Sequence, residues 1–266
     1  MRYIGSKEKL LNYIDGIIQE KNIKSGVFAD IFSGTTRVAQ YFKKKKFSII
    51  SNDNLYFSYL LQKTYIENNI IPQSKRINKP IETAFSFLNN LKREKDYFFE
   101  NFAPSGKYQR MFLTDENASK IDSVLFQIEE WKDENKITEL EKVILKTSLI
   151  EAIPFVSNIS GTYGAYLKTW DKRALKRLIL EIPQFISNNK KNYVYNMDSN
   201  KLIREIEADI IYIDPPYNTR QYISNYHMLE TVARNDKIKL KGKSGLRTDD
   251  DLYKSDYCKR TDVLKH

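Results

Sequence analysis

The segment from Asp209 to Tyr217, DIIYIDPPY, constrains the fold of this chain more than any other. Its mostly apolar, β-favouring residues predict a buried strand of a parallel sheet. Proline cannot continue a central strand, so we expect the strand to end at Asp214 and residues 215 to 217 to form a rigid loop. In open α/β sheets, ligands bind at this carboxyl edge. The segment therefore predicts an α/β fold with a ligand site beside Asp214.

Asp214 and the residues after it offer the groups needed to methylate an amino nitrogen. The Asp214 carboxylate and the Pro215 carbonyl are two acceptors for the hydrogens of an amino group, and proline has no N–H to compete. Tyr217 offers a flat face on which a base can stack. The nitrogen becomes cationic as a methyl group arrives, and Asp214 stabilises that charge. Considered alone, these residues fit a turn or helix cap followed by a rigid loop about equally well.

A strand, a glycine turn and a helix near the N-terminus predict the opening of a doubly wound sheet. Residues 27–32, VFADIF, predict the strand, the turn contains Gly34, and apolar residues at 38, 39 and 42 predict the inner face of the helix. The helix N-terminus then faces the ligand. Asp30, just before the turn, is well placed to meet a positively charged amino group.

Two further predicted strands also end in acids. Residues 47–53 end in Asp53, and an acid at this position is the usual ligand of ribose hydroxyls in nucleoside-binding sheets. An Asx turn is the alternative for Asp53. Residues 193–198 end in Asp198, which could instead cap a short helix over 199–206.

The residues between the second and third strands predict an inserted helical subdomain. Helical patterns cover 81–92, 117–132 and 138–151, and the whole block is too long for a simple crossover between strands. A Gly/Pro loop carries Lys107 and Arg110, which could contact DNA or simply lie at the surface. Residues 158–170 combine glycines and aromatics with Lys168, which suits stacking on bases, while core packing of Tyr166 is the alternative.

Composition narrows the classes of partner. The net charge is +10, which favours a polyanionic partner because neutralised phosphates release counterions. One cysteine and two histidines do not build a typical zinc site, and no apolar run is long enough to span a membrane. Lysines 43 to 46 are expected to be a solvated helix end. His227 is expected to be structural rather than a general base.

The chain resembles the Dam-like class of N-6 adenine DNA methyltransferases from type II restriction–modification systems. The resemblance is carried by the Asp214–Tyr217 motif after a strand, by the residues 218–222 and 225–227, and by the turn after residue 32. It implies S-adenosylmethionine as the cofactor, without a metal. Thr36 stands where the family has a second glycine and lacks glycine's freedom at positive φ, so it could weaken cofactor binding unless the loop stays in an allowed region.

The resemblance and the pattern together assign the candidate site residues. The predicted catalytic residues are Asp214, Pro215, Pro216 and Tyr217. The predicted cofactor-binding residues are Tyr3, Gly5, Lys7, Asp30, Phe32, Gly34, Asp53, Asp198 and Asp214. The predicted DNA-binding residues are Lys107, Arg110, Tyr166, Lys168 and Arg220.

The predicted fold is a Rossmann-like, doubly wound methyltransferase sheet with an inserted helical DNA-recognition subdomain. We expect a discontinuous catalytic domain in 1–60 and 190–236, a helical insert for target recognition in 61–189, and a polar tail or loop in 237–266. The predicted activity is methyl transfer to the adenine amino group in double-stranded DNA, as the modification half of a restriction–modification system in the bacterial cytoplasm.

Two rival functions stay open. Proteins resembling this one carry further sheet strands after the catalytic loop, and no such pattern follows here. The chain could therefore be a truncated or split methyltransferase part that binds DNA or a partner subunit without activity, completed by a second polypeptide. An amino-methyltransferase acting on RNA or a protein amide is the other rival, although protein-amide enzymes usually have Asn where Asp214 stands.

Overall fold

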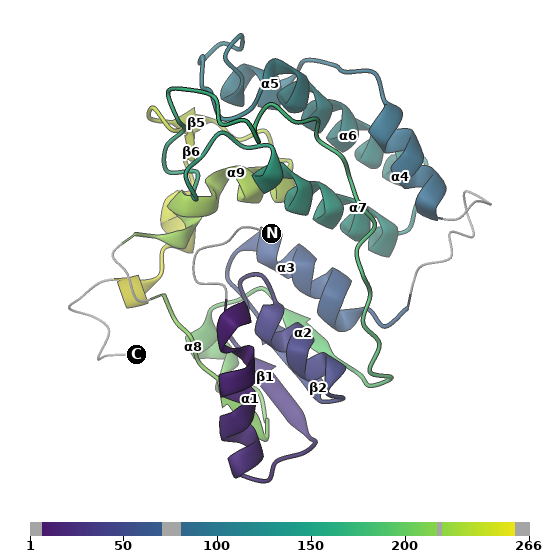
Figure 1. Ribbon diagram of the computed structural model, residues 1–266, viewed down its shortest axis with the longest axis vertical. Coiled ribbons are helices and arrows are strands. Elements are labelled where there is room, and N and C mark those ends of the chain that lie inside the picture. The colour runs from purple at the N-terminus through teal and green to yellow at the C-terminus, as the bar shows by residue number, and fades with distance from the viewer. Residues whose placement is uncertain (1–6, 71–80, 217–219, 259–266) are drawn as a thin grey trace. The chain divides into compact units, whose positions relative to one another are not determined.

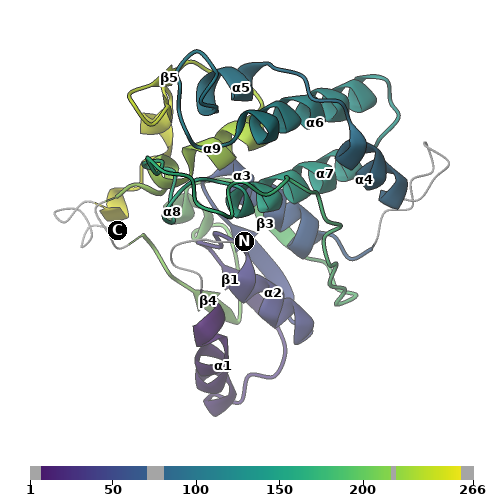
Figure 2. The same cartoon turned by 45° about the horizontal axis from the view of Figure 1, so that its top comes forward.

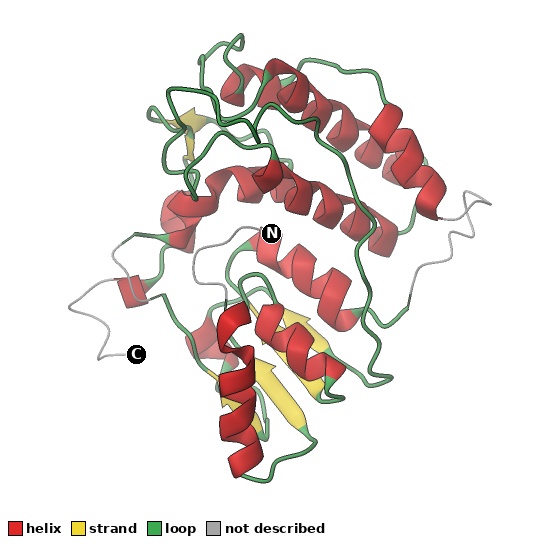
Figure 3. Ribbon diagram, viewed as in Figure 1, coloured by secondary structure: helices red, strands yellow, loops and turns green. Residues whose placement is uncertain are grey.

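The computed structural model describes residues 7–70, 81–216 and 220–258 of the chain. The chain divides into two compact units. The sheet unit comprises 3–71, 184–219 and 255–266, and the helical unit comprises 1–2, 72–183 and 220–254. The first contains a parallel sheet with its helices, and the second is mainly helical (Figure 3).

The sheet unit is built on four parallel strands in the order β3-β2-β1-β4. The strands are β1 (Val27–Asp30), β2 (Ser48–Asn52), β3 (Tyr193–Tyr195) and β4 (Ile210–Tyr212). Asp30 pairs with Ser51 of β2 and with Tyr212 of β4, so the carboxyl ends of these three strands lie level with one another. The α/β fold and its parallel sheet, predicted from the sequence, are confirmed.

Successive side chains of β1 point to opposite faces of the sheet, so the core of this unit has two parts. Phe28 stacks on Phe42 with ring centroids 4.1 Å apart, while Ala29 packs with Ile50 and Leu202 on the opposite face. The helices of the unit are α1 (Leu11–Glu20), α2 (Arg37–Lys44), α3 (Tyr56–Gln62) with its π-helical extension Lys63–Glu67, and α8 (Ser199–Leu202). Short 3₁₀ turns occupy Glu8–Leu10 and Asp256–Cys258.

The strand β4 lies at the edge of the sheet rather than inside it. Ile211 is 40% exposed and Ile213 is 56% exposed, and in the described part of the chain no strand pairs with the outer side of β4. The prediction of a buried strand was therefore wrong for this run. Its apolar composition indicates burial on both sides, but the described residues supply neighbours on one side.

Lys43 is buried, whereas the sequence predicted a solvated run from Lys43 to Lys46. Its ammonium group donates to the carbonyls of Tyr65, Ile66 and Asn68 at 3.0, 2.8 and 2.5 Å. Tyr65 and Ile66 lie in the last part of the π-helical segment, and Asn68 follows its end. Carbonyls at a helix end lack the N–H groups of a following turn. The end of α2 therefore packs against the end of another helix, and Lys43 satisfies its orphan carbonyls. The neighbours Lys44, Lys45 and Lys46 are exposed as predicted.

The helical unit packs α6 against both α5 and α7, and α7 against α9 (Figures 1 and 2). Its elements are α4 (Ile81–Asn90), α5 (Tyr97–Phe102), α6 (Asp115–Asp133), α7 (Glu139–Ala152), a 3₁₀ turn at Ile153–Phe155, α9 (Tyr222–Arg234), the antiparallel pair β5 (Leu240–Lys241) and β6 (Leu246–Arg247), and a 3₁₀ turn at Asp250–Tyr253. Thr114 and Thr138 begin α6 and α7 as side-chain caps, the second in a full capping box. The sequence predicted α4, α6 and α7 within a few residues.

The hairpin after α9 has a built structure where the sequence predicted a polar tail or loop. Arg247 is fully buried and pairs with Asp236 and Asp249 at 2.5 and 2.8 Å. These ion pairs satisfy the buried guanidinium of Arg247, and Leu240 of β5 adds a buried apolar side chain to the segment. Both α9 and this hairpin cluster with the helical unit, whereas the sequence placed residues 190–236 with the sheet.

Candidate active site

The glycine turn after β1 is clamped to the neighbouring strand. Gly34 adopts a φ of 49°, which glycine reaches at low cost. Its N–H donates to the Asp53 carboxylate at 2.8 Å, and its carbonyl accepts from the Ser58 hydroxyl at 2.6 Å. Asp53 from β2 and Ser58 from α3 therefore fix the shape of the loop. Nothing in the sequence around Ser58 distinguishes it from an ordinary helix residue, so this contact was not predicted.

Thr36 takes a left-handed backbone conformation, with φ 62°. The loop thus keeps the left-handed geometry that a second glycine would supply, in a region that is allowed but uncommon for threonine. The buried Thr36 hydroxyl accepts from Gln40 at 2.8 Å and donates to the Thr35 carbonyl at 2.7 Å. These bonds hold a β-branched residue in a conformation that costs it energy.

Asp30 is a buried acid with an unused oxygen. Its side chain is 1% exposed, and its Oδ1 has no hydrogen-bond partner among the described residues. Burial, which has the largest effect, and the nearby carboxylates of Asp53 and Asp214 together raise the pKa of Asp30 to about 7, while backbone hydrogen bonds act against them. A buried carboxylate oxygen without a hydrogen-bond partner fits a cationic amino group. Asp30 therefore fits the role that its position in the sequence predicted.

Asp53 has a structural role that the sequence left as the alternative. Its Oδ1 accepts from the Leu55 N–H at 2.9 Å, which makes the Asx turn, while Oδ2 holds Gly34. Each carboxylate oxygen has a second lone pair, so these bonds leave acceptor capacity for a ribose hydroxyl. Asp198 likewise caps α8, accepting from the N–H groups of Asn200 and Lys201 at 2.9 and 3.2 Å.

Asp214 follows β4 and pairs with Lys7, whose ammonium nitrogen lies 3.0 Å from Asp214 Oδ2. Both side chains are partly buried, with 16% and 26% exposed. Pro215 and Pro216 are half-buried beside them. Tyr3, Gly5 and Tyr217, predicted from the sequence to join this site, lie outside the described residues.

Three acids thus converge from three adjacent strands. Asp30 ends β1, Asp53 follows β2 and Asp214 follows β4, and the electrostatic effect of the last two on Asp30 shows how near they lie. Phe32 packs against the core of the same face, with its ring 5.5 Å from that of Tyr257. Of the predicted catalytic and cofactor-binding residues that the structure describes, Asp30, Asp53 and Asp214 lie at one sheet edge, and Lys7 pairs with Asp214 there. Asp198 lies beyond β3.

The predicted DNA-binding residues fall into two groups in the helical unit. Lys107, Lys168 and Arg220 are exposed. Arg110 is 4% exposed, and its guanidinium donates to the carbonyls of Asn101, Gly242 and Lys243, each at 2.9 Å. Arg110 therefore anchors the loop between β5 and β6, and we correct its assignment from DNA contact to structure. Two of these three carbonyls come from residues more than a hundred positions away, which a local pattern does not reveal.

The aromatic segment 158–170 is fixed to the helical core. Tyr166 is half-buried, with its ring 5.0 Å from that of Phe112. His227 is fully buried and shares a hydrogen bond of 2.8 Å with the Tyr163 carbonyl. Burial lowers the pKa of His227 to about 4, so the ring is neutral near pH 7. The prediction that His227 is structural agrees with this position.

Asn158 organises the same segment and was missed by the sequence analysis. Its side-chain amide donates to the carbonyls of Met111 and Leu167, both at 3.0 Å, and its oxygen accepts from the Asp171 N–H at 2.9 Å. A buried asparagine that bridges three loop positions cannot be told from a surface asparagine by sequence pattern alone.

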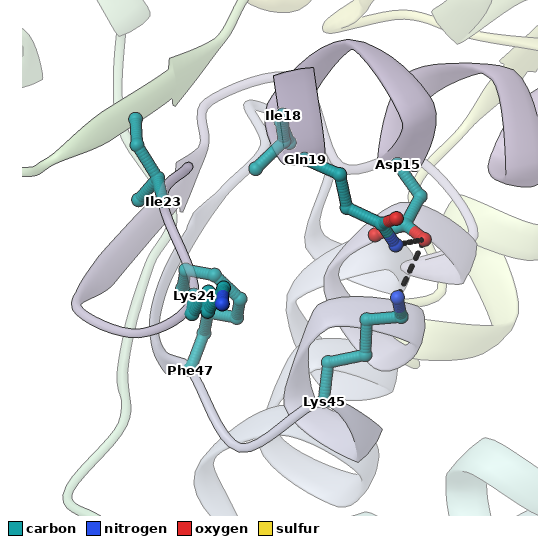
Figure 4. Close-up of a pocket in the computed structure, with 7 residues that line it drawn as sticks. All are labelled: Asp15, Ile18, Gln19, Ile23, Lys24, Lys45 and Phe47. Carbon is teal, nitrogen blue, oxygen red and sulfur yellow. Dashed lines mark hydrogen bonds and ion pairs between the residues drawn. The ribbon is translucent and has the colours of Figure 1, made fainter. Parts of the chain in front are cut away.

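A separate pocket of about 460 Å³ lies beside α1 in the sheet unit (Figure 4). Its lining residues are Asp15, Ile18, Gln19, Ile23, Lys24, Lys45 and Phe47. Several of them immediately precede β1 or β2, so the pocket lies at the amino edge of the sheet, opposite the three acids. Asp15 accepts there from Gln19, Tyr41 and Lys45 and thereby ties α1 to the end of α2.

Two further findings concern the described residues as a whole. They contain no group of three His, Cys, Asp or Glu side chains placed to hold a metal ion. None of the helices found in them is both long and apolar enough to cross a membrane.

Comparison with known proteins gives consistent matches. The chain is 49% identical to the type II methyltransferase M.FokI of Planomicrobium okeanokoites, over 99% of this chain and 41% of that protein. It is 45% identical to modification methylase StsI of Streptococcus sanguinis over the same shares, 99% and 41%. The type II methyltransferase M.NlaIII of Neisseria lactamica is 38% identical over 99% of this chain and 77% of its own length. The chain thus spans less than half of the first two relatives.

No solved structure matches the chain. The model of the D12 class N6 adenine-specific DNA methyltransferases matches residues 3–266, which is nearly the whole chain. This match and the acid-lined sheet edge agree, and the chain belongs to the family of D12 class N6 adenine-specific DNA methyltransferases.

Proposed function

We propose that this chain transfers a methyl group from S-adenosylmethionine to the exocyclic amino group of adenine in double-stranded DNA. We further propose that it acts as the modification part of a type II restriction–modification system. The convergence of Asp30, Asp53 and Asp214 at one edge beside a glycine turn carries this proposal. The family match and the names of the relatives support it.

The residues of the sheet edge fit the methyl donor. S-adenosylmethionine supplies an activated methyl group on a positively charged sulfur. Asp30, with its unused buried oxygen, would hold the amino group of the donor, and Asp53 its ribose hydroxyls. Phe32 and the Gly34 turn would contact the bound donor, and Asp198 would lie near its adenine. Lys7 would close the site together with Tyr3 and Gly5. No metal is needed for this chemistry.

Asp214 and Pro215 orient the target amino group. Each accepts one of its hydrogens, which turns the nitrogen lone pair toward the methyl group, and Pro216 keeps the loop rigid. The Asp214 carboxylate then stabilises the positive charge that develops on nitrogen. The proton can leave after methyl transfer, so no general base is required before it. Positioning therefore supplies much of the rate, with Tyr217 as the face that receives the base.

The target adenine must leave the DNA stack to reach Asp214. The helical unit is our candidate for target recognition, with Lys107, Lys168 and Arg220 exposed for phosphate contacts and Tyr166 partly exposed. The net charge of +10 supports a polyanionic partner. The domain limits that we propose follow the two compact units, so residues 220–254 join the recognition unit instead of the catalytic one.

Incorporation of tritiated methyl groups into DNA tests this function. Asp214→Ala should lose at least about a hundredfold in rate, because an electrostatic group that acts on the transition state is removed. Glu207→Ala, which alters an exposed acid of the same unit, is the matched control and should keep wild-type activity. Full activity of Asp214→Ala would refute the assignment of the site.

A second proposal concerns completeness of the sheet. Ile211 of the edge strand β4 and Ile213 just after it expose apolar surface, as do Tyr13 and Ile17 of α1 and Leu10 just before it. We propose that a second polypeptide segment adds strands to β4 and covers this surface. Without it, the chain would bind DNA or its partner but turn over slowly or not at all.

A further inference from the structure

We propose that Lys7 changes partner during the reaction cycle and thereby couples binding of the methyl donor to release of Asp214. This inference rests on the proposed function, because it assumes that the donor binds at the acid-lined edge. The observation behind it is the ion pair between Lys7 and Asp214, with 3.0 Å between the ammonium nitrogen and the carboxylate oxygen.

The ion pair is poorly suited to the methyl-transfer step. The target nitrogen must approach the Asp214 carboxylate and becomes positively charged as it does so. An ammonium group 3.0 Å from the same carboxylate competes for its lone pairs and repels the developing charge. Lys7 in its present position therefore occupies the acceptor that the target amino group needs.

The charges at the site indicate where Lys7 goes. The carboxylates of Asp30, Asp53 and Asp214 lie together, and Lys7 is the ammonium group paired with this cluster in the described part of the chain. The amino-acid end of the donor brings one ammonium and one carboxylate. The unused Oδ1 of Asp30 fits the ammonium, and the carboxylate beside it requires a cation. Lys7 is within reach of this cluster and is the cation that the donor carboxylate would recruit.

The exchange makes the two binding events interdependent. When the donor carboxylate takes Lys7, Asp214 loses its partner and becomes available to the target amino group. By linkage, any change that frees Lys7 from Asp214 should raise the affinity for the donor, since the ion pair no longer has to be broken. This consequence can be measured by binding alone, without turnover.

The experiment is calorimetry with S-adenosylhomocysteine and with its decarboxylated analogue, which lacks only the carboxylate. Lys7→Met should weaken binding of S-adenosylhomocysteine about tenfold and leave the analogue nearly unchanged, while Lys7→Arg should retain most of the affinity. Asp214→Asn should tighten binding of S-adenosylhomocysteine about fivefold in the wild-type background and have no effect in Lys7→Met. Melting temperatures of all variants control for folding.

The alternatives give different results. If Lys7 merely holds Asp214 in place, Lys7→Met changes both ligands alike, and Asp214→Asn acts equally in both backgrounds; either outcome overturns the exchange while leaving the proposed donor site intact. If neither ligand binds the wild-type chain, the proposed methyl-donor function fails, and the inference fails with it.

Discussion

At the scale of single residues, three acids at the carboxyl ends of neighbouring strands dominate the sheet edge. Asp30, Asp53 and Asp214 each follow a β-favouring run, so their shared edge follows from parallel pairing. Lys43 and Arg110 were misassigned because the carbonyls that they contact come from remote segments. A buried lysine and a solvated lysine have the same local sequence pattern.

The buried Asp30 should make the unfolding free energy of the protein fall as the pH rises. Its pKa in the folded protein is about 7, raised from 3.8, so its contribution to stability is fully present below about pH 4 and is lost as the pH rises through 7. Between pH 6 and 8 this amounts to a loss of about 1.4 kcal/mol in the unfolding free energy. Urea unfolding of the ligand-free protein should show the decline.

Asp30→Asn provides the control for this prediction, because an amide of similar size does not titrate. The variant should lose the part of the slope between pH 6 and 8 that belongs to Asp30. Donor binding should follow the opposite trend in the wild type and strengthen with pH, since a cationic amino group favours the ionised carboxylate. A wild-type slope that is unchanged in Asp30→Asn would show that Asp30 does not titrate in this range.

At the scale of elements, the sequence predicted which segments are helices and strands but not how their ends are satisfied. Hydrophobic periodicity located α6 and α7, and the structure adds the threonine caps that begin them. The N-terminus of α5 is capped instead by a side chain from α6, and Lys120 of α6 donates to the Leu88 carbonyl near the end of α4. The hairpin β5–β6 escaped prediction because its strands are two residues each and depend on buried arginines.

Asp122 should be a strong stabiliser of α5. Its carboxylate accepts from the N–H groups of Asp96, Phe98 and Phe99 at 3.0, 2.7 and 2.8 Å. Asp122→Ala leaves the buried N–H groups of Phe98 and Phe99 without this partner and should cost about 2 kcal/mol in urea unfolding. Hydrogen exchange of the α5 amides should be faster in this variant than in the wild type.

Asp133→Ala is the matched control, because it removes an exposed acid from the same helix. Its effect should stay within about 0.5 kcal/mol. Equal losses for the two variants would mean that helix α6 needs the negative charge and that the cap of α5 contributes nothing measurable.

At the scale of the whole molecule, the sequence correctly predicted a parallel sheet and a helical insertion, and it misjudged the surroundings of β4. An apolar run such as Ile210 to Ile213 indicates two covered faces. The described residues leave Ile211 and Ile213 40% and 56% exposed, and exposed apolar residues on an unpaired edge mark a site for strand addition. The mismatch between composition and exposure is thus itself evidence for a covering segment.

Co-expression with the polypeptide encoded directly downstream tests strand addition at β4. The wild-type chain should co-purify with it and melt at a higher temperature than alone, because apolar surface is buried and the edge amides of β4 gain partners. Ile211→Ser with Ile213→Ser should abolish this association yet change the melting temperature of the isolated chain little, since both side chains are already exposed. Ile203→Ser, at another exposed isoleucine of the sheet unit, should behave as wild type. Slow hydrogen exchange of the β4 amides in the isolated chain, unaltered by co-expression, would show that the sheet needs no further strand.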